Sequence, residues 1–307
     1  MRGCGEPGLR TLGRVLRGLR TLHPRRPIPR YLSAIVVCVL AGSAVAAVVI
    51  RARDGDPGSR ISSAAPGAAS PEPAPQGPTP PARPAPAHLP VIDYWSVPSG
   101  FPADPKPLSV TALTEGLHPA AGAAVYDAPG GRPRAFLPPS ISGVSVTVPI
   151  LARRTGWVAV LLPSVNRTIG WLPAGHWIAR PLHDHLVLRR RTHELTWFRD
   201  GVEQARWTVS TGSTATPTPL GRTFVLGRST PRGAVYGGLD VLVLGSVPDD
   251  RHAVGVALQG AHTGIHSWYR SGVFGRSVSN GCIRVPKAGQ RRLLSAITSG
   301  TPVTVVD

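Results

Sequence analysis

The pattern of apolar positions divides the chain into three stretches of different character. An uncharged apolar run covers residues 31–50, and it is long enough to cross a bilayer, which takes about 20 residues of helix. Residues 51–90 then carry 11 prolines and hardly a large apolar side chain, so they cannot bury a core and are typical of an extended linker. Apolar residues return at Val91, and we expect the folded part of the protein from there onward.

Short apolar runs separated by turn residues indicate β-structure between residues 91 and 182. The expected strands lie at 144–150, 157–162 and 169–172, and the sequence D-A-P-G-G at 127–131 supplies a turn. Several short strands with such punctuation predict a small β-domain.

The C-terminal part, residues 183–307, also has the pattern of a mainly β domain. Residues 192–198 and 202–210 alternate on either side of Asp200-Gly201, which is a strong hairpin signal. Apolar residues at helical spacing predict one short helix over 287–297. Further strands are expected at 186–188, 222–226, 241–244 and 303–306.

Composition and charge predict how the chain is oriented across the membrane. The 34 prolines and 35 glycines argue against an all-α protein. The net charge of +18 comes almost wholly from arginine, and eight arginines with one acid fill residues 1–30, directly before the apolar run. By the positive-inside rule we expect residues 1–30 to be a basic cytoplasmic tail, 31–50 a single membrane anchor, and the rest to lie outside the cell membrane on the wall side. A cleavable signal peptide ending near Ala44-Val45-Ala46 is the alternative.

Cysteine usage and export narrow the chemistry. Cys4 falls in the tail and Cys38 in the anchor, so Cys282 is alone in the exported part. Such a thiol is a buried bystander, an intermolecular bridge or a reactive nucleophile. From residue 91 onward the net charge is +10. Because export removes nucleic acid as a normal partner, we expect this basic surface to face anionic wall polymers and substrate carboxylates.

The segment 262–285, H-T-G-I-H-S-W-Y-R-S-G-V-F-G-R-S-V-S-N-G-C-I-R-V, carries the candidate chemistry. A thiol reacts as thiolate, and a base such as His266 can take its proton. Gly281 would let the backbone approach an oxyanion, whose donors we expect among the amides around Gly281 and Cys282. Arg284, two positions beyond Cys282, could bind a substrate carboxylate in a bidentate fork.

These motifs resemble a known family. The sequence S-N-G-C-I-R, with G-I-H-S before it and V-S-T-G and T-P-L-G (218–221) further upstream, is similar to the signature of L,D-transpeptidases of the YkuD type. The resemblance covers residues 183–307 and implies an L,D-transpeptidase-type β-sandwich with one or two short helices. It makes Cys282 the nucleophile and His266 the general base, with the main-chain carbonyl of Ser267 holding the ring.

The resemblance also implies substrate-binding or loop-shaping roles for Ser279, Asn280, Gly281 and Arg284. Asn280 stands where many relatives have histidine, which leaves His266 as the sole base of the motif. Residues 91–182, with A-V-Y-D-A-P-G-G-R-P, G-W-V-A-V-L-L-P and I-G-W-L-P, are similar to bacterial SH3-like modules. This implies either a wall-binding module or a structural spacer.

The activity implied is peptidoglycan transpeptidation without a cofactor. Stem peptides would be both donor and acceptor, D-Ala would leave, a thioester would form on Cys282, and a 3-3 cross-link would result. Carbapenem-type inhibitors are expected to acylate the same thiol. An L,D-carboxypeptidase, a protein-to-peptidoglycan ligase and a catalytically silent wall-binding protein are the alternatives on this fold.

Other interpretations of the same residues have less support. An inert buried Cys282 does not account for the flanking motif, and the motif matches His266 rather than His262. A structural zinc site needs four ligands, and no convincing fourth accompanies Cys282 and the two histidines, so no metal is expected. A sortase would carry Thr-Leu-x-Thr-Cys, which is absent. Trp268 and Tyr269 could be core residues or walls of a substrate groove.

Overall fold

The computed structural model describes residues 78, 81–94, 99–164, 167–231, 233–245 and 263–307. The predicted cytoplasmic tail, the membrane anchor and most of the linker lie outside the described residues, as do Cys4, Cys38 and His262. Within the described ranges, no helix is long and apolar enough to cross a membrane. All elements described below belong to one compact unit, Ala69–Asp307.

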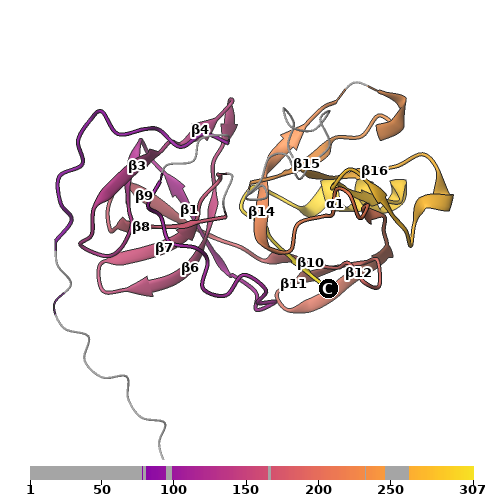
Figure 1. Ribbon diagram of the computed structural model, residues 1–307, viewed down its shortest axis with the longest axis horizontal. Coiled ribbons are helices and arrows are strands. Elements are labelled where there is room, and N and C mark those ends of the chain that lie inside the picture. The colour runs from indigo at the N-terminus through magenta and orange to yellow at the C-terminus, as the bar shows by residue number, and fades with distance from the viewer. Residues whose placement is uncertain (1–77, 79–80, 95–98, 165–166, 232, 246–262) are drawn as a thin grey trace, which may run out of the picture. The chain divides into compact units, whose positions relative to one another are not determined.

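Residues 115–181 form a seven-stranded antiparallel sheet with the strand order β3-β2-β8-β7-β6-β1-β9 (Figure 1). Every residue of β7 is buried, which explains its continuous apolar sequence. The sheet confirms the prediction of β-structure here, while the likeness to SH3 modules stays a prediction. The strands are β1 (Glu115–Pro119), β2 (Ala123–Tyr126), β3 (Pro133–Leu137), β6 (Val148–Arg154), β7 (Trp157–Leu161), β8 (Ile169–Pro173) and β9 (Trp177–Pro181).

The single strand predicted over 144–150 is wrong. The structure has β5 (Val144–Ser145), which pairs with β4 (Ser140–Ile141) in a separate hairpin, and β6 then begins at Val148. Ser142 and Gly143 at the turn have positive φ angles of 49° and 78°. The chain therefore turns back on itself before it enters the main sheet.

A second sheet of eight strands follows, in the order β12-β11-β10-β19-β14-β15-β16-β18. The predicted hairpin is confirmed: β11 and β12 are joined by Asp200 and Gly201, whose φ angles of 49° and 78° suit a tight two-residue turn. With one α-helix among the described residues, the structure confirms a mainly β fold. The strands are β10 (Asp184–Arg189), β11 (Glu194–Arg199), β12 (Val202–Thr208), β14 (Gly221–Ser229), β15 (Val241–Leu244), β16 (Gly264–Ser267), β18 (Ile283–Val285) and β19 (Pro302–Val306).

Helix α1 (Lys287–Ala296) confirms the predicted helix and supports the end of the sheet. Its Gln290 is fully buried, and the side-chain amide donates to the carbonyl of Ile265 on β16 at 3.1 Å. Its Gly289 lies so close to Trp207 and Val285 that a Cβ atom there would come within 2.8 Å of both. The helix is thus held directly against the strands that carry the candidate site.

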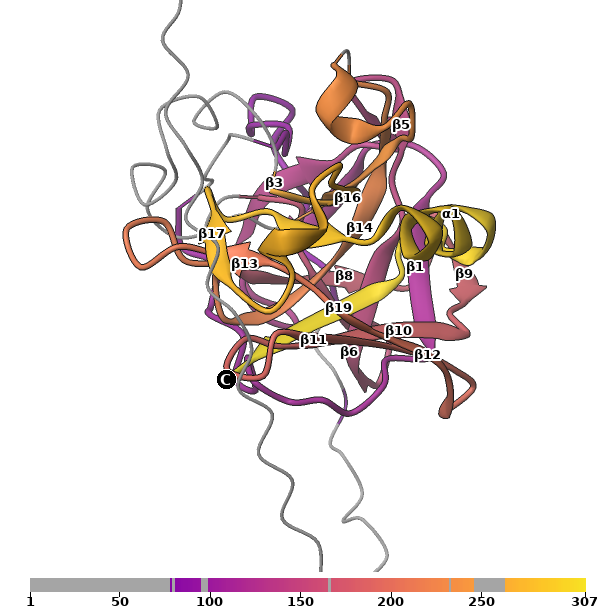
Figure 2. The same ribbon diagram turned by 90° about the vertical axis from the view of Figure 1, so that its right-hand side faces the viewer.

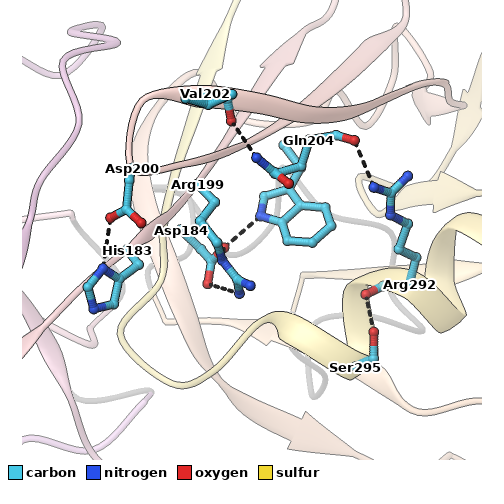
Figure 3. Close-up of polar contacts among 9 residues, drawn as sticks. His183, Asp184, Arg199, Asp200, Val202, Gln204, Arg292 and Ser295 are labelled. Carbon is cyan, nitrogen blue, oxygen red and sulfur yellow. Dashed lines mark hydrogen bonds and ion pairs between the residues drawn. The ribbon is translucent and has the colours of Figure 1, made fainter.

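A polar cluster joins α1 to the hairpin β11–β12 (Figure 3). Asp184 accepts hydrogen bonds from the guanidinium of Arg199 at 2.9 and 3.0 Å and from the indole of Trp197 at 2.7 Å. Arg292 on α1 donates to the main-chain carbonyl of Gln204 at 2.8 Å. Asp184 is buried, so its charge is neutralised by Arg199 rather than by water.

Strand β14 contributes to two hydrophobic cores. Phe224 and Leu226 pack into the core of the first sheet, whereas Val225 packs into the core of the second. Alternate residues of a strand point to opposite faces, so one strand can serve both. Beside them, Arg222 pairs with Asp104, and both side chains are buried. The two sheets are therefore joined by shared packing and a buried ion pair.

Candidate active site

The parallel pairing of β16 and β18 places His266 and Ser267 beside the strand that directly follows Cys282. Ile265 pairs with Ile283 and His266 with Arg284. Cys282 comes directly before β18, two positions ahead of Arg284. The short strand β17 (Ser277–Ser279) pairs in parallel with β13 (Thr211–Gly212) (Figure 2). The turn that contains Cys282 lies between β17 and β18.

The His266 ring is held in one tautomer and in neutral form. Its Nδ1 lies 2.8 Å from the carbonyl oxygen of Ser267, the contact expected from the resemblance. Nδ1 therefore carries the proton, and Nε2 has the lone pair that a base needs. Burial lowers the pKa of His266 to about 4, partly offset by the Ser267 carbonyl and reinforced by the charge of Arg284. The imidazole is uncharged near neutral pH.

Cys282 is partly exposed, yet burial of the sulfur raises the pKa of its thiol. The backbone of Gly264 and the positive charge of Arg284 act in the opposite direction but do not outweigh burial. At rest Cys282 is thus a thiol and His266 a neutral imidazole. His266 has therefore not taken the thiol proton at rest, because neither group is solvated well enough to carry a charge.

The turn before Cys282 is closed by the Ser279 hydroxyl. Ser279 Oγ accepts the N–H of Gly281 at 3.2 Å and donates to the carbonyl of Cys282 at 2.5 Å. Gly281 has a φ of 106°, which only glycine adopts readily. The amide of Gly281 is therefore engaged inside the turn, and the expectation that the amides around Gly281 and Cys282 line an oxyanion hole stays a prediction. Asn280 is exposed at the tip of the turn.

The guanidinium of Arg284 lies over an aromatic ring at the edge of the site. Its guanidinium carbon is 3.7 Å from the centroid of the Trp268 ring, which restricts the fork to one plane. Its Nε is buried and has no acceptor among the described residues. The neighbouring Tyr269 is 56% exposed, so it is not a core residue. This edge can receive an anionic group.

Two tyrosines at the site were not predicted from the sequence. Tyr236 lies in the short 3₁₀ helix η1 (Ala234–Tyr236), packs edge-on against His266 at 5.1 Å and accepts the Ser267 hydroxyl at its carbonyl. Tyr94 comes from the segment before the first sheet. Burial raises the pKa of its hydroxyl, the backbone of Thr263 lowers it, and the Cys282 charge raises it. No local motif marks either residue, because both reach the site through tertiary packing.

Candidate metal ligands do not gather in the parts of the chain that the structure describes. No group of three or more His, Cys, Asp or Glu residues there could hold a metal ion.

The match to a known family covers the residues of the candidate site other than Tyr94. Residues 183–305 match the YkuD family, described as the L,D-transpeptidase catalytic domain. This confirms the predicted resemblance for this part of the chain, which we call the YkuD domain.

Solved structures with similarity to the chain include three L,D-transpeptidases. One from Mycobacterium tuberculosis H37Rv is 18% identical over 46% of this chain and 73% of its own, with a TM-score of 0.34. One from Mycobacterium smegmatis is 16% identical over 62% and 97%, with a TM-score of 0.34. The catalytic domain of the E. faecium enzyme acylated by ertapenem is 19% identical over 40% and 97%, with a TM-score of 0.30. No curated protein matches the sequence.

Proposed function

We propose that the YkuD domain is a peptidoglycan L,D-transpeptidase that uses Cys282 as its nucleophile and His266 as its base. The observation that carries the proposal is the pairing of β16 with β18, which places His266 beside the strand that follows Cys282. The Ser267 contact leaves Nε2 of His266 as the proton acceptor. A nucleophile next to an oriented base is the arrangement that acyl transfer through a covalent intermediate requires.

The first half of the reaction forms a thioester. Nε2 of His266 takes the Cys282 proton while the sulfur attacks the carbonyl of residue 3 in a tetrapeptide stem. A carbon–sulfur bond forms, the bond to D-Ala breaks, and the imidazolium returns the proton to the departing amine. Because both groups start neutral, no charge separation has to be maintained before the substrate arrives.

The second half transfers the acyl group to an amine. The side-chain amine of residue 3 in a second stem attacks the thioester, His266 takes its proton, and the thiol is regenerated as the 3-3 cross-link forms. The buried Nε of Arg284, which has no acceptor among the described residues, supports binding of a stem carboxylate at this edge. Water in place of the amine would make the enzyme an L,D-carboxypeptidase.

We also propose that the domain works on the wall side of the cell membrane, anchored by residues 31–50. The apolar run with eight arginines before it supports this placement. The proline-rich linker would give the domain reach into the wall layer.

Replacement of the thiol tests the proposed function. The full-length chain should convert defined tetrapeptide muropeptides into 3-3 dimers with release of D-Ala, and Cys282→Ala should abolish both because no thioester can form. Intact-mass measurement should show one carbapenem adduct on the unaltered chain and none on Cys282→Ala. Cys4→Ala, the same change in the predicted tail, should behave like the unaltered chain.

Three outcomes would contradict the proposed function or indicate a different one. A carbapenem adduct that persists in Cys282→Ala would refute the nucleophile. Tripeptides without dimers would indicate a carboxypeptidase, and unchanged muropeptides would indicate a silent wall-binding protein.

A further inference from the structure

The peptide that joins Gly281 to Cys282 is held from one side by Thr218. Thr218 lies between β13 and β14 and is 1% exposed. Its hydroxyl oxygen lies 2.9 Å from the amide nitrogen of Gly212 and 2.9 Å from the carbonyl oxygen of Gly281. The Gly212 amide can only donate, so the single hydroxyl proton of Thr218 goes to Gly281. The direction of both hydrogen bonds is therefore fixed.

This contact determines where the amide of Cys282 points. In a trans peptide the C=O and the following N–H lie in one plane and point in opposite directions. With the Gly281 carbonyl directed at Thr218, the Cys282 N–H is directed away from it. That N–H has no acceptor among the described residues, whereas the Gly281 N–H is bound by Ser279. The Cys282 N–H is therefore available to a ligand, and it belongs to the nucleophile itself.

The Gly281–Cys282 peptide needs such a restraint. Gly281 has no Cβ and tolerates many backbone angles, so this peptide plane could rotate at little steric cost. Thr218 is itself well fixed, because it stands between Pro217 and Pro219, whose rings restrict the backbone. Arg190 also donates to the Thr218 carbonyl at 2.7 Å. Thr218 thus supplies a restraint that Gly281, without a Cβ atom, does not provide.

We propose that Thr218 is a positioning residue for the oxyanion: its hydroxyl keeps the Cys282 amide directed at the substrate carbonyl oxygen. The inference rests on the proposed acyl-transfer function. When sulfur attacks the carbonyl, negative charge develops on that oxygen, and a donor already in place stabilises it without reorganisation. Loss of the Thr218 hydroxyl lets the peptide turn, and the Gly281 carbonyl can then face the oxyanion instead of the N–H.

Two reactions of the Cys282 thiol distinguish a role of Thr218 in positioning the oxyanion donor from a general structural role. Acylation by a carbapenem passes through an oxyanion, whereas alkylation by iodoacetamide displaces iodide and forms none. Thr218→Val keeps the shape of the side chain and removes the hydroxyl. We expect it to slow acylation of Cys282 by about 10- to 100-fold and to leave the alkylation rate within about twofold. Thr218→Ser keeps the hydroxyl and should restore acylation.

The measurement is peptide-resolved mass spectrometry of the full-length chain, which distinguishes Cys282 from Cys4 and Cys38. Thr196→Val is the matched control, since Thr196 is equally buried but lies on β11, outside the turn. Thr218→Ala removes the same hydroxyl without a second methyl group at the site, and the same two rates apply to it if the valine variant does not fold.

The inference is overturned if Thr218→Val acylates at the normal rate, or if acylation and alkylation fall together. A chain with unaltered sequence that is alkylated but never acylated would remove the proposed function and this inference with it. Normal acylation of the unaltered chain with equal loss of both rates in the variant would remove the inference alone.

Discussion

At the scale of single residues, the protonation of His266 and Cys282 determines how the reaction can start. Burial lowers the pKa of the imidazole and raises that of the thiol, so each group avoids its charged form. A neutral pair is unreactive toward solvent oxidants, because thiolate is the reactive form of cysteine. Proton transfer must then accompany the attack on the carbonyl.

This neutral pair predicts an unusual pH profile for acylation. With a pKa of about 4 for His266, the rate of carbapenem acylation should be constant between about pH 5 and 7 and fall only as the pH drops through about 4. His266→Gln should lower the rate at every pH by about 100-fold or more, whereas His183→Gln, at an exposed histidine, should change nothing. Rapid-mixing kinetics over this range provide the measurement.

An acid limb near pH 6.5 would show that the ring titrates normally and would contradict the neutral pair. The stability of the folded chain should depend on pH in the same direction, decreasing toward acid pH. Because the folded-state pKa of His266 is lowered, the unfolded chain takes up the proton first as the pH falls below 6.5. The stability contributed by the neutral ring is complete above that pH and is lost as the pH falls through about 4.

At the scale of elements, substitution of Asp184 tests which contacts hold the hairpin β11–β12 in place. Asp184→Asn removes the charge that faces Arg199 and one acceptor of the fork (Figure 3). We expect a loss of about 2 kcal/mol in the free energy of unfolding, measured with urea. Asp200→Asn, in the exposed pair with His183, should cost below about 1 kcal/mol. Equal effects of the two substitutions would contradict a special role for the buried carboxylate.

The elements also differ in how well the sequence predicts them. The hairpin at Asp200-Gly201 and helix α1 are confirmed because their signals are local: turn residues with positive φ and a helical apolar spacing. Strands β16 and β18 are only four and three residues long, and they pair with each other in parallel. Short strands of this kind have no hairpin turn to mark them, so the apolar pattern does not predict them.

The features of the candidate site also differ in how well the sequence predicts them. The resemblance to L,D-transpeptidases around Cys282 implies the nucleophile, the base and the Ser267 contact, and the structure contains that contact. The fate of the Gly281 amide could not be predicted, since it depends on the Ser279 rotamer. The contact from Thr218 joins residues 63 positions apart, so only the folded chain reveals what that threonine holds.

At the scale of the whole described unit, the Asp104–Arg222 pair predicts that the two sheets unfold together. Both side chains are buried, so Asp104→Asn leaves an uncompensated guanidinium. We expect a loss of about 3–5 kcal/mol in the free energy of unfolding. Asp104→Leu combined with Arg222→Met should recover most of it, because an apolar pair needs no charge compensation.

Calorimetry measures the stability of both variants and the number of unfolding transitions. We expect one transition for the unaltered chain, since Phe224 of the YkuD domain lies in the core of the first sheet. Two separate transitions, or an unchanged midpoint in Asp104→Asn, would contradict the coupling.

Strand β14 places a limit on how this protein could be altered in evolution or by design. A single residue inserted between Phe224 and Val225 would reverse the direction of every side chain beyond it. The aliphatic groups that now fill one interior would be turned into the other, which is shaped for different ones. Substitutions along this strand can therefore be tolerated one at a time, but a change in its length would damage two interiors at once.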